Sequence, residues 1–114
     1  MFINFTNHPS SNWGEKQKNA AQVYGEIKDI LFPEISPQAS EEEIEELAEQ
    51  YVEDIVKENP SAVLCQGEYT FVYQVVQKLK EKNIIVLAAC SKRNVVEVDN
   101  KRIVEFQFEQ FRKY

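Results

Sequence analysis

The alternation of apolar and polar positions divides the chain into strand-helix units. Four short apolar runs have the length of buried strands, at residues 2–5, 27–32, 62–65 and 84–89. Stretches with apolar residues at helical spacing separate these runs. Such units predict a parallel sheet with right-handed crossovers and helices on both faces. We therefore expect an α/β protein with a Rossmann-like, three-layer fold and the strand order 2-1-3-4.

Two segments carry the signature of a helix start. Asn12 is followed three residues later by Glu15, and Ser40 by Glu43, and both pairs fit a capping box. The second pair opens the most regular helical pattern, with apolar residues at Ile44, Leu47, Ala48, Tyr51, Val52 and Ile55. The acidic residues of that segment suit the start of a helix and a solvated face, so we assign them no function.

From Arg93 onward the apolar period changes from helical spacing to two. Apolar residues alternate with polar ones on either side of a turn near residues 99–101, at Val96, Val98, Val104, Phe106 and Phe108. This pattern predicts an antiparallel β-hairpin at one edge of the sheet or at a subunit interface. Because the hairpin presents an apolar face that a sheet of this size does not cover alone, we expect a homodimer.

Length and charge limit the classes of partner. A chain of 114 residues is the size of one domain, so we expect residues 1–114 to form a single unit. The net charge of −6 argues against a broad basic face that coats a large nucleic acid. A small anionic ligand stays possible, because backbone N–H groups and one or two cations can hold a phosphate on an acidic protein.

The N-terminus and the cysteines indicate a cytoplasmic protein. The opening MFINFTNHPSS has no basic leader and no small-residue cleavage site, and no stretch reaches the ~18 apolar residues of a membrane span. Cys65 and Cys90 each end an apolar run, without a CxxC motif or a metal-ligand spacing. We interpret both as buried thiols in a reducing compartment, and we expect no metal and no cofactor.

The predicted topology places a binding site between strands 1 and 3. Ligands bind open parallel sheets outside the carboxyl ends of the strands, where the winding of the chain reverses. Residues 6–11 and 66–70 form the loops that meet there, and residues 91–93 arrive from the fourth strand. The candidate ligand-binding residues in these loops are Asn7, Ser10, Ser11, Gln66, Gly67, Thr70, Ser91 and Arg93.

Each of these residue types has a physical reason to meet an anion. Asn7, Ser10 and Ser11 supply hydrogen-bond donors at the start of a helix, where free N–H groups already favour negative charge. Gly67 lets the backbone approach a ligand closely, and Thr70 begins the next helix. Arg93 forms with its neighbour Lys92 a local pair of cations in an acidic chain.

Two residues are candidate catalytic groups. His8 is the only histidine, and its side chain has an unperturbed pKa near neutrality, as a general acid or base requires. It could equally order the turn in which it lies. Glu68 could act in the same way or bind a ribose hydroxyl, or it could cap the helix after Gly67. For Cys90 we favour a packed thiol over a nucleophile.

The chain lacks the motifs of several enzyme classes. It has no GxGxxG after the first strand, no GxxxxGK[ST] and no Gly-x-Ser-x-Gly elbow. Dinucleotide binding, a P-loop and an α/β-hydrolase are therefore disfavoured.

The run FINFTNHPSS at residues 2–11, with VLCQGE at 63–68 and the closing residues 106–114, resembles small CRISPR-associated proteins of type III systems. These are compact Rossmann-like relatives of ligand-sensing domains. The resemblance implies binding of cyclic oligoadenylate, a ring of phosphodiester-linked adenosines, and leaves open whether the ring is also cleaved. A ring nuclease of this kind needs no metal: His8 or Glu68 would assist proton transfer, and Lys92 and Arg93 would stabilise the charge on phosphorus.

Two alternatives stay open beside this interpretation. One is a small enzyme that acts on a free nucleotide or nucleoside with Glu68 as its nucleophile. The other is an interaction domain without catalysis, in which the loops or the hairpin bind a protein.

Overall fold

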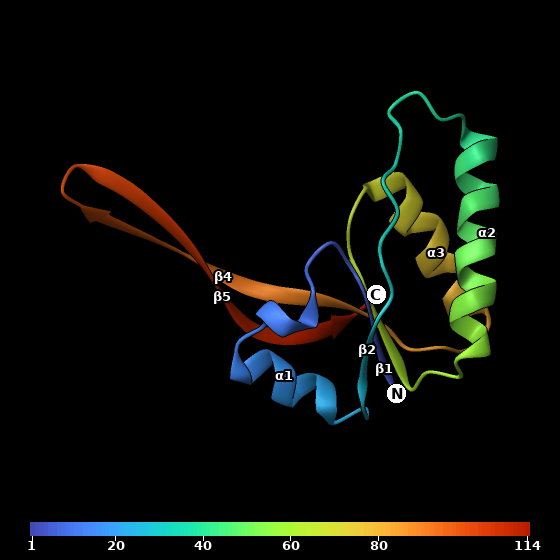
Figure 1. Ribbon diagram of the computed structural model, residues 1–114, viewed down its shortest axis with the longest axis horizontal. Coiled ribbons are helices and arrows are strands. Elements are labelled where there is room, and N and C mark those ends of the chain that lie inside the picture. The colour runs from blue at the N-terminus through green and yellow to red at the C-terminus, as the bar shows by residue number, and fades with distance from the viewer.

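A mixed five-stranded sheet forms the centre of the computed structural model, which describes residues 1–114 (Figure 1). The strands lie in the order β2-β1-β3-β4-β5. Their bounds are Phe2–Phe5 for β1, Ile27–Asp29 for β2, Ala62–Cys65 for β3, Val86–Val98 for β4 and Lys101–Lys113 for β5. β2, β1, β3 and β4 run parallel, and β5 is antiparallel to β4.

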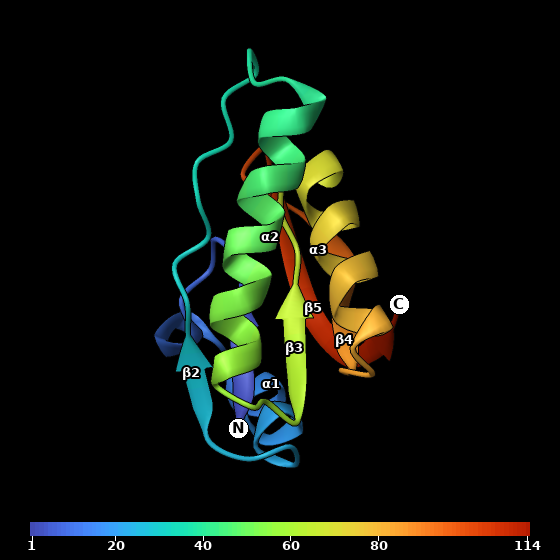
Figure 2. The same ribbon diagram turned by 90° about the vertical axis from the view of Figure 1, so that its right-hand side faces the viewer.

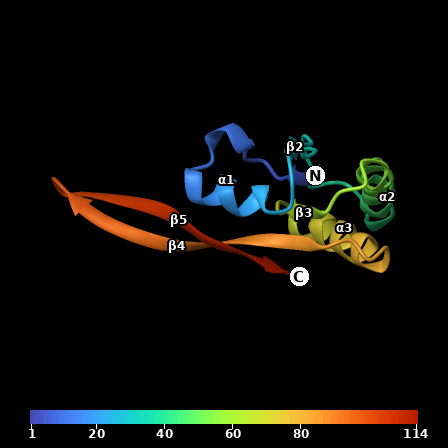
Figure 3. The same ribbon diagram turned by 90° about the horizontal axis from the view of Figure 1, so that it is seen from below.

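Helices cover both faces of this sheet. Helices α2 (Glu41–Lys57) and α3 (Tyr69–Glu81) pack side by side over one face (Figure 2). The short 3-10 helix η1 (Ser10–Asn12) and helix α1 (Glu15–Gln22) lie over the other (Figure 3). The chain is therefore an α/β protein, as the sequence predicts. None of its helices combines the length and the apolar composition needed to cross a bilayer.

The face under α2 and α3 carries the larger part of the core. Ile3 and Phe5 point to this face from β1, and Val63 and Cys65 from β3. The predicted capping box is confirmed here, because the side chain of Ser40 accepts a hydrogen bond from the N–H of Glu43 and the return bond is also present. The period of α2 directs its apolar side chains toward the sheet, and that burial holds the layer in place.

The opposite face has a smaller core around the ring of Phe2. This ring lies 6.1 Å from Trp13, 6.0 Å from Tyr24 and 5.2 Å from Phe111 between ring centroids. Trp13 comes from the segment between η1 and α1, and Phe111 from β5. Aromatic packing on this face therefore connects β1 with β5.

The predicted strand order needs a correction. The sequence predicts four parallel strands in the order 2-1-3-4 with an additional hairpin at the sheet edge or at a subunit interface, whereas the sheet has five strands in the order 2-1-3-4-5. Residues 91–93, expected in a loop, instead continue β4, which pairs with β5 along its whole length. The register shifts between Cys90 and Ser91, where Glu109 of β5 is the extra residue of a β-bulge.

Three local predictions were also wrong. The expected capping box at Asn12 is absent, because Asn12 closes η1 and Gly14 is the N-cap of α1. The second strand ends at Asp29 rather than at residue 32. Cys90 is half-buried, whereas Cys65 is buried as expected, and burial raises the pKa of the Cys65 thiol to about 12.

Residues 91–108 of β4 and β5 form a two-stranded ribbon that we call the arm. The arm projects from the body of the molecule (Figure 1). Its turn is formed by Asp99 and Asn100, whose positive φ angles of 52° and 62° are those of a type I′ hairpin turn. The Cα radius of gyration is 15.6 Å, compared with about 13 Å for a compact domain of this length. The arm therefore makes the molecule elongated.

Candidate functional site

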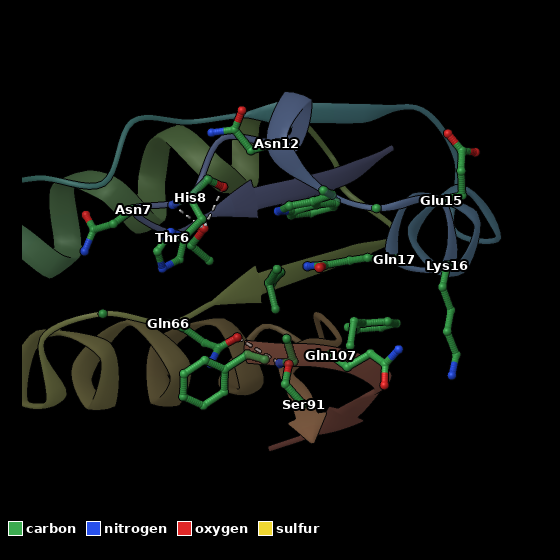
Figure 4. A pocket seen from close by; sticks show the side chains of 17 residues that line it. Thr6, Asn7, His8, Asn12, Glu15, Lys16, Gln17, Gln66, Ser91 and Gln107 are labelled. Carbon is green, nitrogen blue, oxygen red and sulfur yellow. Dashed lines mark hydrogen bonds between the residues drawn. The ribbon is translucent and has the colours of Figure 1, made fainter. Parts of the chain in front are cut away.

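A cleft of about 950 Å³ lies between the η1–α1 segment and the sheet, at the carboxyl ends of β1 and β3 (Figure 4). β1 and β3 are hydrogen-bonded neighbours, as the predicted site requires. The lining residues are Thr6, Asn7, His8, Asn12, Trp13, Gly14, Glu15, Lys16, Gln17, Leu64, Gln66, Gly67, Ala89, Ser91, Phe106, Gln107 and Phe108.

The cleft contains part of the predicted site. Five of the predicted residues line it: Asn7, His8, Gln66, Gly67 and Ser91. They come from the loops after β1 and β3 and from the middle of β4, so the structure brings together segments that are far apart in the sequence.

The other predicted residues lie elsewhere. Ser10 and Ser11 belong to η1 but do not line the cleft, and Thr70 begins the helix on the opposite face of the sheet. Lys92 and Arg93 lie in the arm, where Arg93 stands across from Phe106. The expected pair of cations is therefore outside the cleft.

A buried amide holds the loop that follows β1. The Nδ2 group of Asn4 donates to the carbonyl of His8 at 2.8 Å and to Oδ1 of Asp29 at 3.0 Å. Its Oδ1 accepts from the hydroxyl of Thr6 at 2.8 Å, and that hydroxyl accepts from the N–H of His8 at 3.1 Å. Asp29 also accepts from the N–H of Ser10 at 3.1 Å. These bonds fix the loop backbone and leave the imidazole of His8 exposed at the cleft.

Asn4 and Asp29 were not predicted as residues of the site. The available signal was the amide of Asn4 inside the apolar run FINF, because a polar group buried in a strand must find partners. The position of Asp29 opposite Asn4 follows from the parallel register of β1 and β2, which the sequence does not reveal.

Gln66 is oriented by the neighbouring strand. Its Oε1 accepts a hydrogen bond from the N–H of Ala89 at 2.8 Å (Figure 4). This bond anchors the side chain at the start of the loop after β3. The Nε2 group donates to no other atom of the chain, so it is available to a ligand.

The rest of the lining is rich in amides and aromatic rings that the sequence analysis missed. Gln17 of α1 reaches toward the middle of the cleft, whereas Glu15 points away from it (Figure 4). Phe106 and Phe108 come from the arm. No local pattern could assign these residues to the site, because the sequence does not reveal which part of the hairpin pairs with the fourth strand beside the cleft. Lys16 is the one lysine that lines the cleft, and its ammonium lies 3.3 Å from a carboxylate oxygen of Glu109.

Glu68 caps helix α3, which was one of its predicted roles. Its carboxylate accepts from the N–H of Thr70 at 2.6 Å and from the N–H of Phe71 at 3.1 Å. The hydrogen bond from the hydroxyl of Thr70 is the main reason why the pKa of the Glu68 carboxyl is lower than usual. Glu68 borders a smaller hollow beside the cleft and does not line the cleft itself.

Packing against Phe32 requires a glycine at residue 67, which also lines the cleft. A Cβ atom at this position would lie 2.3 Å from the ring of Phe32. Any larger residue would therefore displace that ring, which is buried in the core under α2. Because residue 67 has no side chain, its backbone can line the cleft on one side and contact the ring of Phe32 on the other.

Comparison with known proteins identifies a family and no individual relative. No curated protein and no solved structure gives a significant match. The model of the uncharacterized protein MJ1673 family matches residues 1–112. Because this match spans nearly the whole chain, the protein belongs to the uncharacterized protein MJ1673 family.

Proposed function

We propose that this protein binds a small nucleotide in the cleft, and that the nucleotide is a cyclic oligoadenylate. The observation that carries the proposal is the composition of the cleft, which combines amide side chains and aromatic rings at the carboxyl ends of β1 and β3. Parallel sheets bind ligands at this place, and nucleobases need these two kinds of contact.

The amides suit the edge of an adenine base. An amide side chain can accept from the exocyclic amino group of adenine and donate to a ring nitrogen at the same time. Gln17 reaches into the cleft (Figure 4), and the Nε2 group of Gln66 is also available at its lining. The ring of Phe106 is 71% exposed, so its face is open to stacking with a base.

The charge of the cleft suits a phosphodiester better than a polyphosphate. Lys16 is the only lysine in the lining, no arginine lines it, and Glu15 stands beside Lys16. A nucleoside triphosphate would bring several negative charges on adjacent phosphates into this setting, whereas a cyclic oligoadenylate of four nucleotides carries a similar total charge but spreads it around the ring, one charge per nucleotide. The hydroxyl of Ser91 and the Nε2 group of Gln66 can donate to a phosphate oxygen without adding charge.

Isothermal titration tests the binding proposal. We expect heat with cyclic tetra-adenylate or cyclic hexa-adenylate and weaker binding with linear tetra-adenylate and ATP. Gln17→Ala should weaken binding by about tenfold, because it removes a hydrogen-bonding amide from the lining. Gln50→Ala is the matched control, since Gln50 is exposed on α2 and does not line the cleft. The absence of heat with every cyclic adenylate would contradict the proposal.

Cleavage of the ring is a second candidate function, favoured by the position of His8. Its imidazole is exposed at the cleft while its backbone is held by Asn4 and Thr6. In this reaction a ribose 2′-oxygen bonds to the adjacent phosphorus as its proton passes to a base, and the bond from phosphorus to the 5′-oxygen breaks as that oxygen takes a proton. The products are a 2′,3′-cyclic phosphate and a 5′-hydroxyl. The geometry favours His8 over Glu68 as the proton-transfer group, because Glu68 is engaged at the start of α3.

Chromatography of the reaction products tests cleavage separately from binding. We expect cleavage to persist in EDTA, and His8→Ala to lower the rate more than it weakens affinity. Glu68→Gln should keep most of the rate. Binding without products would leave a binding protein and reject the catalytic role of His8.

A further inference from the structure

The arm exposes apolar side chains on both of its faces. Val95, Val104 and Phe106 lie on one face, and Val96 and Ile103 on the other, and at least 40% of each of these residues is exposed. A two-stranded ribbon alone in water is marginally stable. Helices cover the rest of the sheet, whereas no other element of the chain covers the arm.

The surface area of the chain supports the same conclusion. The chain exposes 7820 Å², compared with about 6,500 Å² for a compact monomer of this mass. The excess of roughly 1,300 Å² exceeds the ~800 Å² that each partner contributes to a standard protein interface. A second layer on one face of the arm would remove part of this excess.

The register of the arm identifies the face that continues from the cleft. Ser91 and Phe108 both line the cleft and are cross-strand partners. Side chains alternate between faces along a strand, so every second row of the arm shares their face. The rows of this cleft-side face, from the body to the tip, are Ser91–Phe108, Arg93–Phe106, Val95–Val104 and Glu97–Arg102.

We propose that a second copy of this chain covers the cleft-side face of the arm, with the two arms antiparallel about a two-fold axis through the Val95–Val104 row. This axis places Val95 and Val104 against their own counterparts. It places Arg93 opposite Glu97 of the other copy, and the ring of Phe106 opposite the guanidinium of Arg102. Neither Arg93, Glu97 nor Arg102 has an ion pair within the chain.

The self-complementary charges are the reason to choose a second copy over an unrelated protein. An isologous interface requires that a patch match itself, and the Arg93–Phe106, Val95–Val104 and Glu97–Arg102 rows of this face do so. An antiparallel arrangement is also required by shape. Helix α1 and η1 rise from the same side as the cleft-side face, so parallel arms would bring the two α1 helices into one space (Figure 3).

The arrangement completes each cleft with residues of the other copy. The two-fold axis sets the tip of one arm, at Asp99 and Asn100, opposite the Ser91–Phe108 row of the other. Arg102 then lies beside the Phe106 that lines the other cleft, and it adds a cation to a lining that has only Lys16. The inference goes beyond the proposed function and does not rest on it, since it follows from the arm alone.

Exchange of charges between two variants tests the axis. Sedimentation equilibrium of the unmodified chain at micromolar concentration should give a dimer. Arg93→Glu sets two glutamates against each other, and Glu97→Arg sets two arginines against each other, so each variant alone should dimerise at least about tenfold more weakly. An equal mixture of the two variants should restore the dimer, because both pairs regain opposite charge in the heterodimer.

Cross-linking tests which face is covered. With Cys90→Ser removing the half-buried thiol, Val95→Cys should link two chains through a short bismaleimide, because residue 95 faces its own counterpart. Val96→Cys, its neighbour on the opposite face, is the matched control and should link far less. Circular dichroism of each variant checks that the chain is folded. A monomer at tens of micromolar, a mixture that stays as weak as its components, or preferential linking through residue 96 would each overturn the proposal, whatever the cleft binds.

Discussion

The two faces of the sheet differ although the same short strands form both. On the face under α2 and α3, Phe5 packs with its ring centroid 5.1 Å from Phe32 and 5.3 Å from Tyr51. Asn4, one residue earlier in β1, is buried on the other face. Its side chain forms hydrogen bonds with the loop beside the cleft and with Asp29. One face is closed by two long helices, and the other is left open beyond the short helix α1.

This difference separates stability from function along a single strand. The closed face buries apolar rings, which stabilise the fold without specifying a ligand. The open face uses polar contacts to fix a loop and leaves amides and rings uncovered. Substitutions of core residues on the closed face should therefore change the free energy of unfolding, and substitutions in the cleft lining on the open face should change binding.

The largest expected effect is that of Phe5→Ala on the closed face. Loss of the ring leaves a cavity among Phe32, Tyr51 and Phe71, and we expect the free energy of unfolding to fall by about 3–5 kcal/mol. Urea unfolding measures the change. Gln17→Ala on the open face is the control, with an expected change below about 0.5 kcal/mol. Equal losses for the two variants would erase the distinction between the faces.

Gly67→Ala tests the boundary between the faces. The new methyl group would force the ring of Phe32 aside, and overpacking of this kind costs about 1–3 kcal/mol. Thermal and urea unfolding should both show the loss. Gly14→Ala is the control for overpacking, because a Cβ at residue 14 meets no atom within 4 Å, so its loss should be only the smaller one of an alanine at an N-cap. If Gly67→Ala were as stable as the parent chain, the ring of Phe32 would be able to move aside without cost. The close packing between residue 67 and Phe32 would then not contribute to stability.

Asp29→Ala tests the polar side of the comparison. It removes the acceptor for Asn4 and for the N–H of Ser10, and because the carboxylate is exposed we expect a loss of about 1 kcal/mol. Ligand affinity should fall as well, since the loop that carries His8 loses one of its supports. Asp54→Ala, at an exposed position on α2, should change neither quantity. A loss of affinity for both variants would point to a general charge effect instead.

The smallest expected effect is a pH dependence at Glu68. Folding lowers the pKa of this carboxyl, so its cap stabilises the folded state above the ordinary carboxyl pKa, and this contribution disappears as the pH falls through the lowered value. Glu68→Gln should lower the melting temperature slightly at pH 7, and the difference should disappear once the pH falls below the lowered pKa. A difference that persists in acid would mean that hydrogen bonding rather than charge makes the cap.

The sequence predicted the body of the fold better than the arm. Strands 2–5 and 62–65 and the capping box at Ser40 were correct, because burial on both faces and a two-way hydrogen bond leave clear patterns. Residues 91–93 were assigned to a loop because they are polar. In the arm, beyond the helices, polar side chains on a strand meet solvent without penalty, so polarity there does not mark a loop.

The candidate site was predicted in place but only in part in its residues. The loops after β1 and β3 were correctly brought together, since parallel strands fix where their ends meet. Gln17, Phe106 and Gln107 were missed because they reach the cleft from a helix and from the arm, and their positions depend on tertiary packing. Residue type and spacing alone could not decide whether Glu68 caps the following helix or acts in the site.

The turn at Asp99 and Asn100 also gives the arm a place in the order of folding. Each row of the ribbon closes only a short loop once that turn has formed, whereas Phe2 must pair with Ala62 across more than half of the chain. Local hairpins form within about 1–10 μs, and non-local parallel pairing is slower because the loop entropy must be overcome first. We therefore expect the two strands of the arm to pair before the parallel strands of the sheet do. The element that we infer to join two copies is then available before either copy has completed its own sheet.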